Sequence, residues 1–151
     1  MFDHLFEEGR IGKMRIKNRI FLAPMVRNYA DAEGRATDRY VAHIERLARG
    51  GVGAMTLEAS YVSPDGKGFR HQLGLHDDGV VAGLRRLVEA AHRHGAVIGP
   101  QLYHAGRQTV SAVTGLTLLA PSPIPCPLER ETPRGMTAAD IARIVGQFGD
   151  A

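Results

Sequence analysis

Three short apolar runs along the chain predict three buried strands. They cover residues 20–23, 52–58 and 96–102. The second and third runs each follow a segment of helical periodicity that ends in glycine, the order expected of a parallel strand after a crossover helix. Pro24 ends the first run, because proline cannot continue a strand ladder. The alternation of strands and helices therefore predicts an α/β fold with a parallel sheet.

Apolar residues at helical spacing predict three helices. Thr37 is the expected N-cap of the first, which should end at Gly50–Gly51. Asp77–Asp78 should cap the second, and Thr137 opens a third with a capping-box pattern. The apolar faces are Tyr40, Val41, Ile44, Leu47 and Ala48 in the first helix, Val81, Leu84, Leu87, Val88 and Ala91 in the second, and Ile141, Ile144, Val145 and Phe148 in the third.

The remaining segments are predicted to be connections. Residues 11–16 alternate around Gly12 and favour a small hairpin. Residues 60–76 form a long loop rich in glycine and charge, and loops of this length in a compact domain are usually functional. A run with four prolines between 121 and 127 is unsuited to a helix or a central strand. Because no linker or shift in composition divides the chain, we expect one unit over residues 1–151.

Composition and charge argue against several classes of protein. Apolar residues make up 44% and charged residues 23%, with a net charge of +3 spread along the chain, so neither a nucleic-acid partner nor a membrane partner is expected. The single cysteine, Cys126, excludes an intrachain disulfide and any cysteine-only cluster or zinc site. The acidic start lacks the pattern of a signal peptide. We therefore expect a cytoplasmic protein.

The third apolar run ends in the densest group of polar side chains. Catalytic and binding residues usually lie at the carboxyl ends of parallel strands, in open sheets and in barrels. This makes the end of the third strand the first place to look for a site. Around Gly106, the cluster consists of Gln101, Tyr103, His104, Arg107 and Gln108.

Several sequence blocks, in a fixed order, carry a resemblance to a known family. They are LF at 5–6, IG at 11–12, KNRI at 17–20, APM at 23–25, RGGVG at 49–53, EA at 58–59, QLYHAGR at 101–107 and APS at 120–122. With these blocks the chain resembles the amino-terminal part of the old yellow enzyme family. These NADH:flavin oxidoreductases, which include 2,4-dienoyl-CoA reductase-like members, are FMN-binding (β/α)8 barrels. The resemblance implies a partial TIM barrel, with an N-terminal hairpin and about three βα units.

The resemblance also implies a set of cofactor contacts. Gln101 matches a glutamine that pairs with the pyrimidine edge of the flavin, a role for which an amide that both donates and accepts is suited. Many relatives carry cysteine or threonine at position 26, where they donate toward flavin O4; Val26 has no such donor. Tyr29 is a candidate aromatic of the substrate pocket, with loop packing as its alternative. The cofactor-binding residues implied are Ala23, Pro24, Met25, Val26, Ala59 and Gln101. The alternative is an ordinary core residue for Val26 and Ala59, and capping of loop backbone groups for Gln101.

Two titratable residues near the strand ends have structural and functional interpretations. His104 is either a catalytic group or a structural hydrogen-bonding residue. Glu58 is either a base or a member of a buried ion pair, with Arg107 as the expected partner. The histidines show no metal-ligand spacing, so no metal site is expected.

The chain lacks parts that a complete family member needs. A closed barrel takes eight βα units and typically ~250 residues. In relatives the substrate-binding histidine pair, the phosphate-binding loops and the iron–sulfur cysteines come later in the sequence. Two functions therefore stay open. One is part of an FMN-dependent oxidoreductase that uses NAD(P)H and acts on activated C=C bonds of a small molecule. The other is a non-catalytic truncated product or scaffold that self-associates or packs with a complementing chain.

Overall fold

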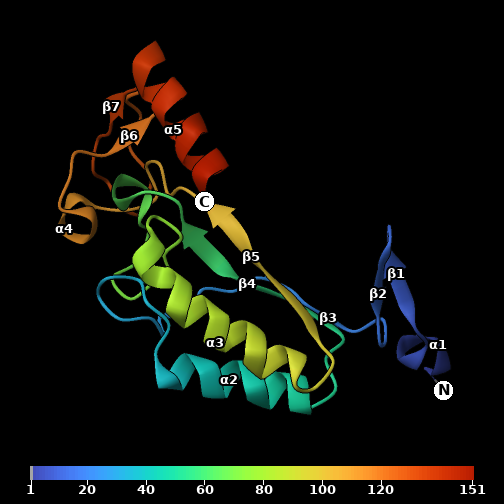
Figure 1. The fold of residues 1–151 in the computed structure, drawn as a ribbon. Coiled ribbons are helices and arrows are strands. Elements are labelled where there is room, and N and C mark those ends of the chain that lie inside the picture. The colour runs from blue at the N-terminus through green and yellow to red at the C-terminus, as the bar shows by residue number, and fades with distance from the viewer. Residues whose placement is uncertain (1) are drawn as a thin grey trace.

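A three-stranded parallel sheet with two helices on one face forms the centre of the chain. The computed structural model describes residues 2–151. β3 (Phe21–Leu22), β4 (Ala54–Tyr61) and β5 (Val97–Tyr103) lie side by side in that order. α2 (Asp38–Arg49) and α3 (Val81–His92) pack next to each other against the sheet (Figure 1). The predicted α/β class with parallel strands is confirmed.

The hydrophobic core lies between these two helices and the sheet. Tyr40 and Ile44 of α2 meet Leu87 and Ala91 of α3 over Leu57 of β4, and all five side chains are buried. These are the positions that the helical periodicity assigns to the inner faces. The apolar stripe is therefore what holds α2 and α3 on the sheet.

The helix ends follow the predicted capping chemistry, with one difference. The Thr37 side chain accepts a hydrogen bond from the N–H of Tyr40, and Gly51 adopts a φ of +103° just after α2, a conformation that favours glycine. Thr137 forms the expected capping box at the start of α5 (Ala138–Asp150). Asp77 instead caps a short 3₁₀ turn that leads into α3, because its side chain accepts from the N–H of Gly79.

Strand boundaries shift by a few residues from those expected. β4 begins at Ala54 and extends past Glu58 to Tyr61. It is longer because the following loop returns beside it: the Tyr61 N–H donates to the carbonyl of Leu73, and the N–H of Leu75 donates to the carbonyl of Tyr61. Backbone pairing with the loop thus supports the last residues of the strand.

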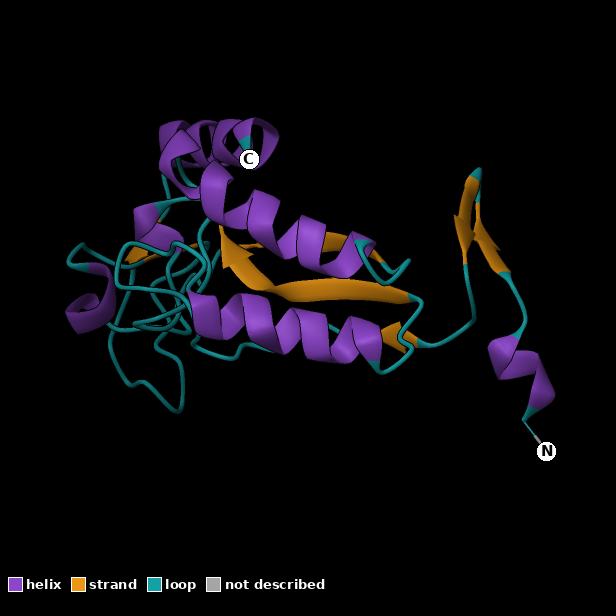
Figure 2. Cartoon of the chain, turned by 60° about the horizontal axis from the view of Figure 1, so that its bottom comes forward, coloured by secondary structure: helices purple, strands orange, loops and turns teal. Residues whose placement is uncertain are grey.

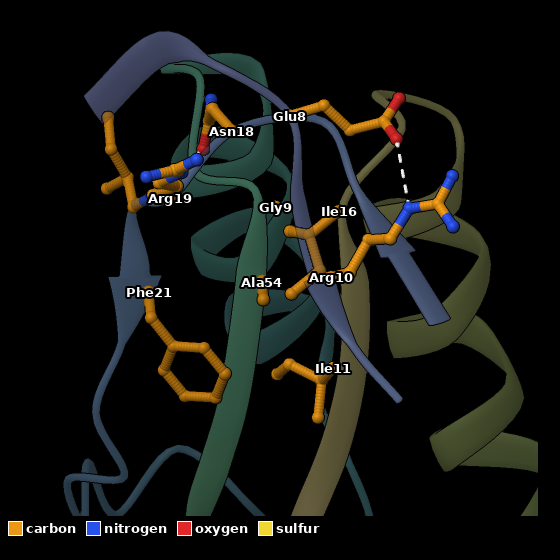
Figure 3. A pocket seen from close by; sticks show the side chains of 10 residues that line it. Glu8, Gly9, Arg10, Ile11, Ile16, Asn18, Arg19, Phe21 and Ala54 are labelled. Carbon is orange, nitrogen blue, oxygen red and sulfur yellow. Dashed lines mark hydrogen bonds and ion pairs between the residues drawn. The ribbon is translucent and has the colours of Figure 1, made fainter. Parts of the chain in front are cut away.

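The predicted hairpin is present at the end of the sheet where the strands begin. β1 (Gly9–Ile11) and β2 (Met14–Ile16) pair antiparallel after the short helix α1 (Asp3–Phe6). In Figure 2 this hairpin stands apart from the helices at the end opposite the carboxyl ends of the strands. A cleft of about 560 Å³ separates it from the starts of β3 and β4, with Phe21 and Ile11 pointing into it (Figure 3).

The last third of the chain gathers beyond the carboxyl end of β5. It contains α4 (Ser111–Thr114) and a short parallel pair, β6 (Leu119–Ala120) with β7 (Arg134–Gly135), followed by α5 (Figure 1). The proline-rich run between β6 and β7 is irregular, as predicted. None of the helices within residues 2–151 has both the length and the apolar character needed to cross a membrane.

Candidate functional site

A β-bulge shapes the carboxyl end of β4. Thr56 pairs with Gly99 and Ala59 pairs with Gln101, so β4 spends three residue steps where β5 spends two. Bulges occur next to active sites because the additional residue re-aims the side chains that follow it. Here the bulge brings Ala59 directly opposite Gln101, and two of the predicted site residues become neighbours across the sheet.

The amide of Gln101 is free to bind another molecule. Its side chain is exposed, and no hydrogen bond to it is found within residues 2–151. Gly99, two residues earlier in β5, has no atom within 4 Å of the position that a Cβ would occupy. A shallow cleft of about 300 Å³ runs past Gly99 and Thr56 on this face. The exposed amide of Gln101 therefore lies two residues beyond a position on β5 that has open space beside it.

The segment after β3 alternates toward and away from solvent. Ala23 and Met25 are exposed, whereas Pro24 and Val26 are half-buried. The Val26 side chain is apolar, so this position has no hydrogen-bond donor apart from its backbone N–H. Whether this segment lies against a flavin stays a prediction.

Glu58 is buried and accepts hydrogen bonds from the backbone, not from an arginine. Its carboxylate receives the N–H of Arg27 at 2.6 Å and the N–H of Leu73 at 3.2 Å. Burial raises the pKa of Glu58 above its usual range, although these N–H groups act in the opposite direction. The expected ion pair with Arg107 is wrong. Arg107 is exposed and donates to the carbonyls of Ile124 and Pro125 instead.

Gln72 is a second buried polar residue at the same strand end, and no sequence pattern indicated its role. Its side chain is 0% exposed. The amide nitrogen donates to the carbonyl of Ala59 at 2.6 Å, while the amide oxygen accepts the N–H of Gly68 at 2.7 Å. Gln72 therefore connects the long loop to the residue that faces Gln101. The signal available in the sequence was only an amide within a glycine-rich loop.

His104 packs as a structural residue below the loop that follows β4. The backbone N–H of Gly106 donates to its Nδ1 at 3.0 Å, and its Nε2 lies 3.8 Å from the carboxylate of Asp65. Asp65 in turn accepts from Arg143 of α5 at 2.7 Å. Burial lowers the pKa of His104, an effect that Asp65 opposes and Arg143 reinforces. These contacts join β5, the loop and α5, and they agree with the structural interpretation.

Tyr29 packs on the start of α2. Its ring stands edge-on to Tyr40 and His43, and the guanidinium of Arg39 lies 3.9 Å from the ring centroid. The carbonyl of Tyr29 accepts from the hydroxyl of Thr37. These are the contacts of a loop-packing tyrosine, and a role for Tyr29 toward substrate stays a prediction.

The family of the chain follows from a comparison with known proteins. The model of the NADH:flavin oxidoreductase / NADH oxidase family matches residues 4–151. The chain belongs to this family. The chain is 45% identical over 152 residues to the NADH oxidase of Thermoanaerobacter brockii, covering 99% of itself and 23% of that protein. It is 41% identical to the NADPH dehydrogenase of Geobacillus thermodenitrificans, covering 97% of itself and 42% of that protein.

Solved structures of the same family have the same fold as this chain. A 2-naphthoyl-CoA reductase in complex with 2-naphthoyl-CoA superposes with a TM-score of 0.90 at 27% identity, over 97% of this chain and 24% of that one. The old yellow enzyme homologue from Zymomonas mobilis superposes with a TM-score of 0.85 at 26% identity, over 97% of this chain and 43% of that one. The chain thus spans under half the length of these relatives, and its fold corresponds to part of their TIM barrel.

Proposed function

We propose that this chain supplies the amino-terminal part of an FMN-dependent NAD(P)H:flavin oxidoreductase of the ene-reductase type. The observation that carries the proposal is the pairing of Ala59 with Gln101 on the open face of the sheet. A small side chain beside a free amide suits a flat heteroaromatic ring with alternating carbonyl and N–H groups at its edge. Membership in the flavin oxidoreductase family supports the same assignment.

The residues in this chain would bind and orient the ring. The Gln101 amide nitrogen would donate to a ring carbonyl while its oxygen accepts a ring N–H. Ala23, Pro24, Met25 and Val26 would line the ring beside it. The chemistry that FMN supplies when bound is hydride transfer from NAD(P)H to an activated carbon–carbon double bond. The single cysteine, Cys126, is too few to bind an iron–sulfur cluster. A cytoplasmic location belongs to the same proposal.

Reconstitution tests the proposal. A polypeptide supplying the remaining βα units would be mixed with the chain, and FMN binding would be followed by quenching of flavin fluorescence. We expect saturable quenching only when both polypeptides are present. Flavin binding by the complementing polypeptide alone, with no change on adding this chain, would contradict the proposal.

A second candidate is a non-catalytic role in which the chain self-associates or packs with another chain. It is favoured by the two edge strands of the sheet, β3 and β5. Phe21 on β3 is 53% exposed and Leu102 on β5 is 43% exposed. Unpaired strand edges flanked by apolar side chains attract further strands. A scaffold of this kind would bind its partner without binding FMN, which separates it from the first candidate.

A further inference from the structure

Two loops meet at one buried carboxylate. The segment after β3 contains the residues proposed to face FMN, and it is followed directly by Arg27 and Asn28. The loop after β4 reaches the same place with Leu73. Glu58, with 2% of its surface exposed, accepts the N–H of Arg27 and the N–H of Leu73 with its two different oxygens.

The bulge explains why this carboxylate is available. Along β4, Leu57 packs into the core with the helices, and Ala59 is paired with Gln101. Glu58 lies between them, inside the irregular stretch of the register. A regular strand would place neighbouring side chains on opposite faces. With the additional residue, Glu58 is directed to the loops while Ala59 remains available on the side of Gln101.

The contacts of Glu58 are directed at backbone groups that need an acceptor. A buried N–H without a partner costs free energy comparable to a lost hydrogen bond. The backbone around Arg27 is also unusual, because Asn28 has a φ of +54°, in the left-handed region. A charged acceptor makes a stronger hydrogen bond than a neutral one and can hold such a segment in one conformation.

We propose that Glu58 is a positioning residue for the cofactor site: its carboxylate fixes the backbone of residues 23–28 relative to β4, and so sets where Ala23–Val26 would meet the ring. Gln72 complements it by holding the carbonyl of Ala59 from the same loop. The inference rests on the proposed function for the identity of the ring. The anchoring of the two loops is tested without any cofactor.

Hydrogen exchange followed by mass spectrometry tests the anchoring, on the chain assembled with a polypeptide that supplies the remaining βα units and without FMN. Glu58→Gln keeps the shape of the side chain but replaces one acceptor oxygen with a donor group, which faces an N–H. We expect exchange at least tenfold faster in segments 23–30 and 69–76, with α2 and α3 unchanged. Glu89→Gln, an exposed change on α3, is the matched control and should alter neither segment. If Glu58→Gln does not fold, Glu58→Asp replaces it in the experiment. This variant keeps the negative charge but shortens the side chain, so exchange in the same two segments is compared with the parent.

Two exchange results would overturn the inference. Unchanged exchange in both segments would remove Glu58 as an anchor. Uniformly faster exchange over the whole chain would make it an ordinary core residue. When the chain is assembled with the complementing polypeptide, we expect Glu58→Gln to raise the Kd for FMN at least tenfold. An unchanged Kd, although exchange in the two segments is faster, would also overturn the inference. If the unmutated complemented chain binds no FMN, the proposed function fails, while exchange still decides whether Glu58 anchors the loops.

Discussion

Ala59 of β4 lies directly opposite Gln101 of β5, as a Cα pair in the parallel ladder. The relationship exists only because of the bulge between Thr56 and Ala59. It places the smallest chiral side chain next to a primary amide that has no hydrogen-bond partner among residues 2–151. Within the proposed flavin site, this pair consists of two residues that both come from this chain and lie next to each other.

Replacing the amide should weaken cofactor binding. In a holo assembly containing this chain, Gln101→Ala should weaken the free energy of FMN binding by about 1–3 kcal/mol. The reason is that buried ring groups would lose their hydrogen-bond partner without regaining water. Fluorescence quenching during titration of the apo protein with FMN measures the effect. Gln108→Ala, another exposed glutamine but located after the strand, is the control. Equal affinities for Gln101→Ala and the parent would remove Gln101 from the site.

Position 26 should tune the flavin potential. Val26→Thr or Val26→Cys adds a donor beside the expected position of flavin O4, which becomes more electron-rich on reduction. A net hydrogen bond of ~1 kcal/mol favouring the reduced form corresponds to a rise of roughly 20 mV for a two-electron couple. Redox titration against reference dyes measures it, with Val113→Thr in α4 as the control. A lower potential in the Val26 variants would mean that the side chain points elsewhere.

The ion pair between Asp65 and Arg143 should stabilise the docking of α5 in a pH-dependent way. Burial alone would raise the pKa of Asp65. Arg143, Ser63 and the charge of His104 outweigh that effect, so the pKa of Asp65 lies below its usual range. A carboxyl with a lowered folded-state pKa contributes stability above its unfolded-state pKa. That contribution is lost as the pH falls through the folded-state pKa.

Asp65→Asn should therefore destabilise the chain near neutral pH by about 1–3 kcal/mol, the range for hydrogen bonds to charged partners. The difference from the parent should shrink below a pH of about 4. Thermal unfolding of the chain assembled with the complementing polypeptide, followed by circular dichroism at several pH values, measures both. Glu7→Gln breaks an exposed pair with Arg19 and should cost no more than about 1 kcal/mol. A loss for Asp65→Asn that does not change with pH would contradict the role of the charge.

The sequence predicted the larger elements of the fold because each has its own local signal. Thr37 and Thr137 cap their helices, and the apolar face that contains Leu87 packs on the sheet as periodicity requires. The first and last residues of the strands were predicted less accurately, because strand ends depend on pairing with segments distant in sequence. The return of the loop beside Tyr61 is an example that no local pattern encodes.

The site was predicted less completely, for a physical reason. The run from 52 to 58 reads VGAMTLE and does not alternate regularly between apolar and polar residues, so its pattern could not reveal the bulge. Glu58 was expected to pair with a side-chain cation, but its partners are N–H groups from two loops distant in sequence. Backbone donors are identical at almost every position of a sequence. Their meeting with Glu58 and Gln72 becomes visible only when the chain is folded.

We propose that this chain provides one part of a flavin site and is not a working flavoenzyme by itself. Three parallel strands cannot close a barrel, and the exposed edges of β3 and β5 favour association. The isolated 151-residue chain should therefore be colourless and self-associated or partly unfolded. Light scattering combined with visible absorbance on the purified chain tests this most directly. A compact monomer that carries stoichiometric FMN and reduces an enone with NADPH would contradict the account.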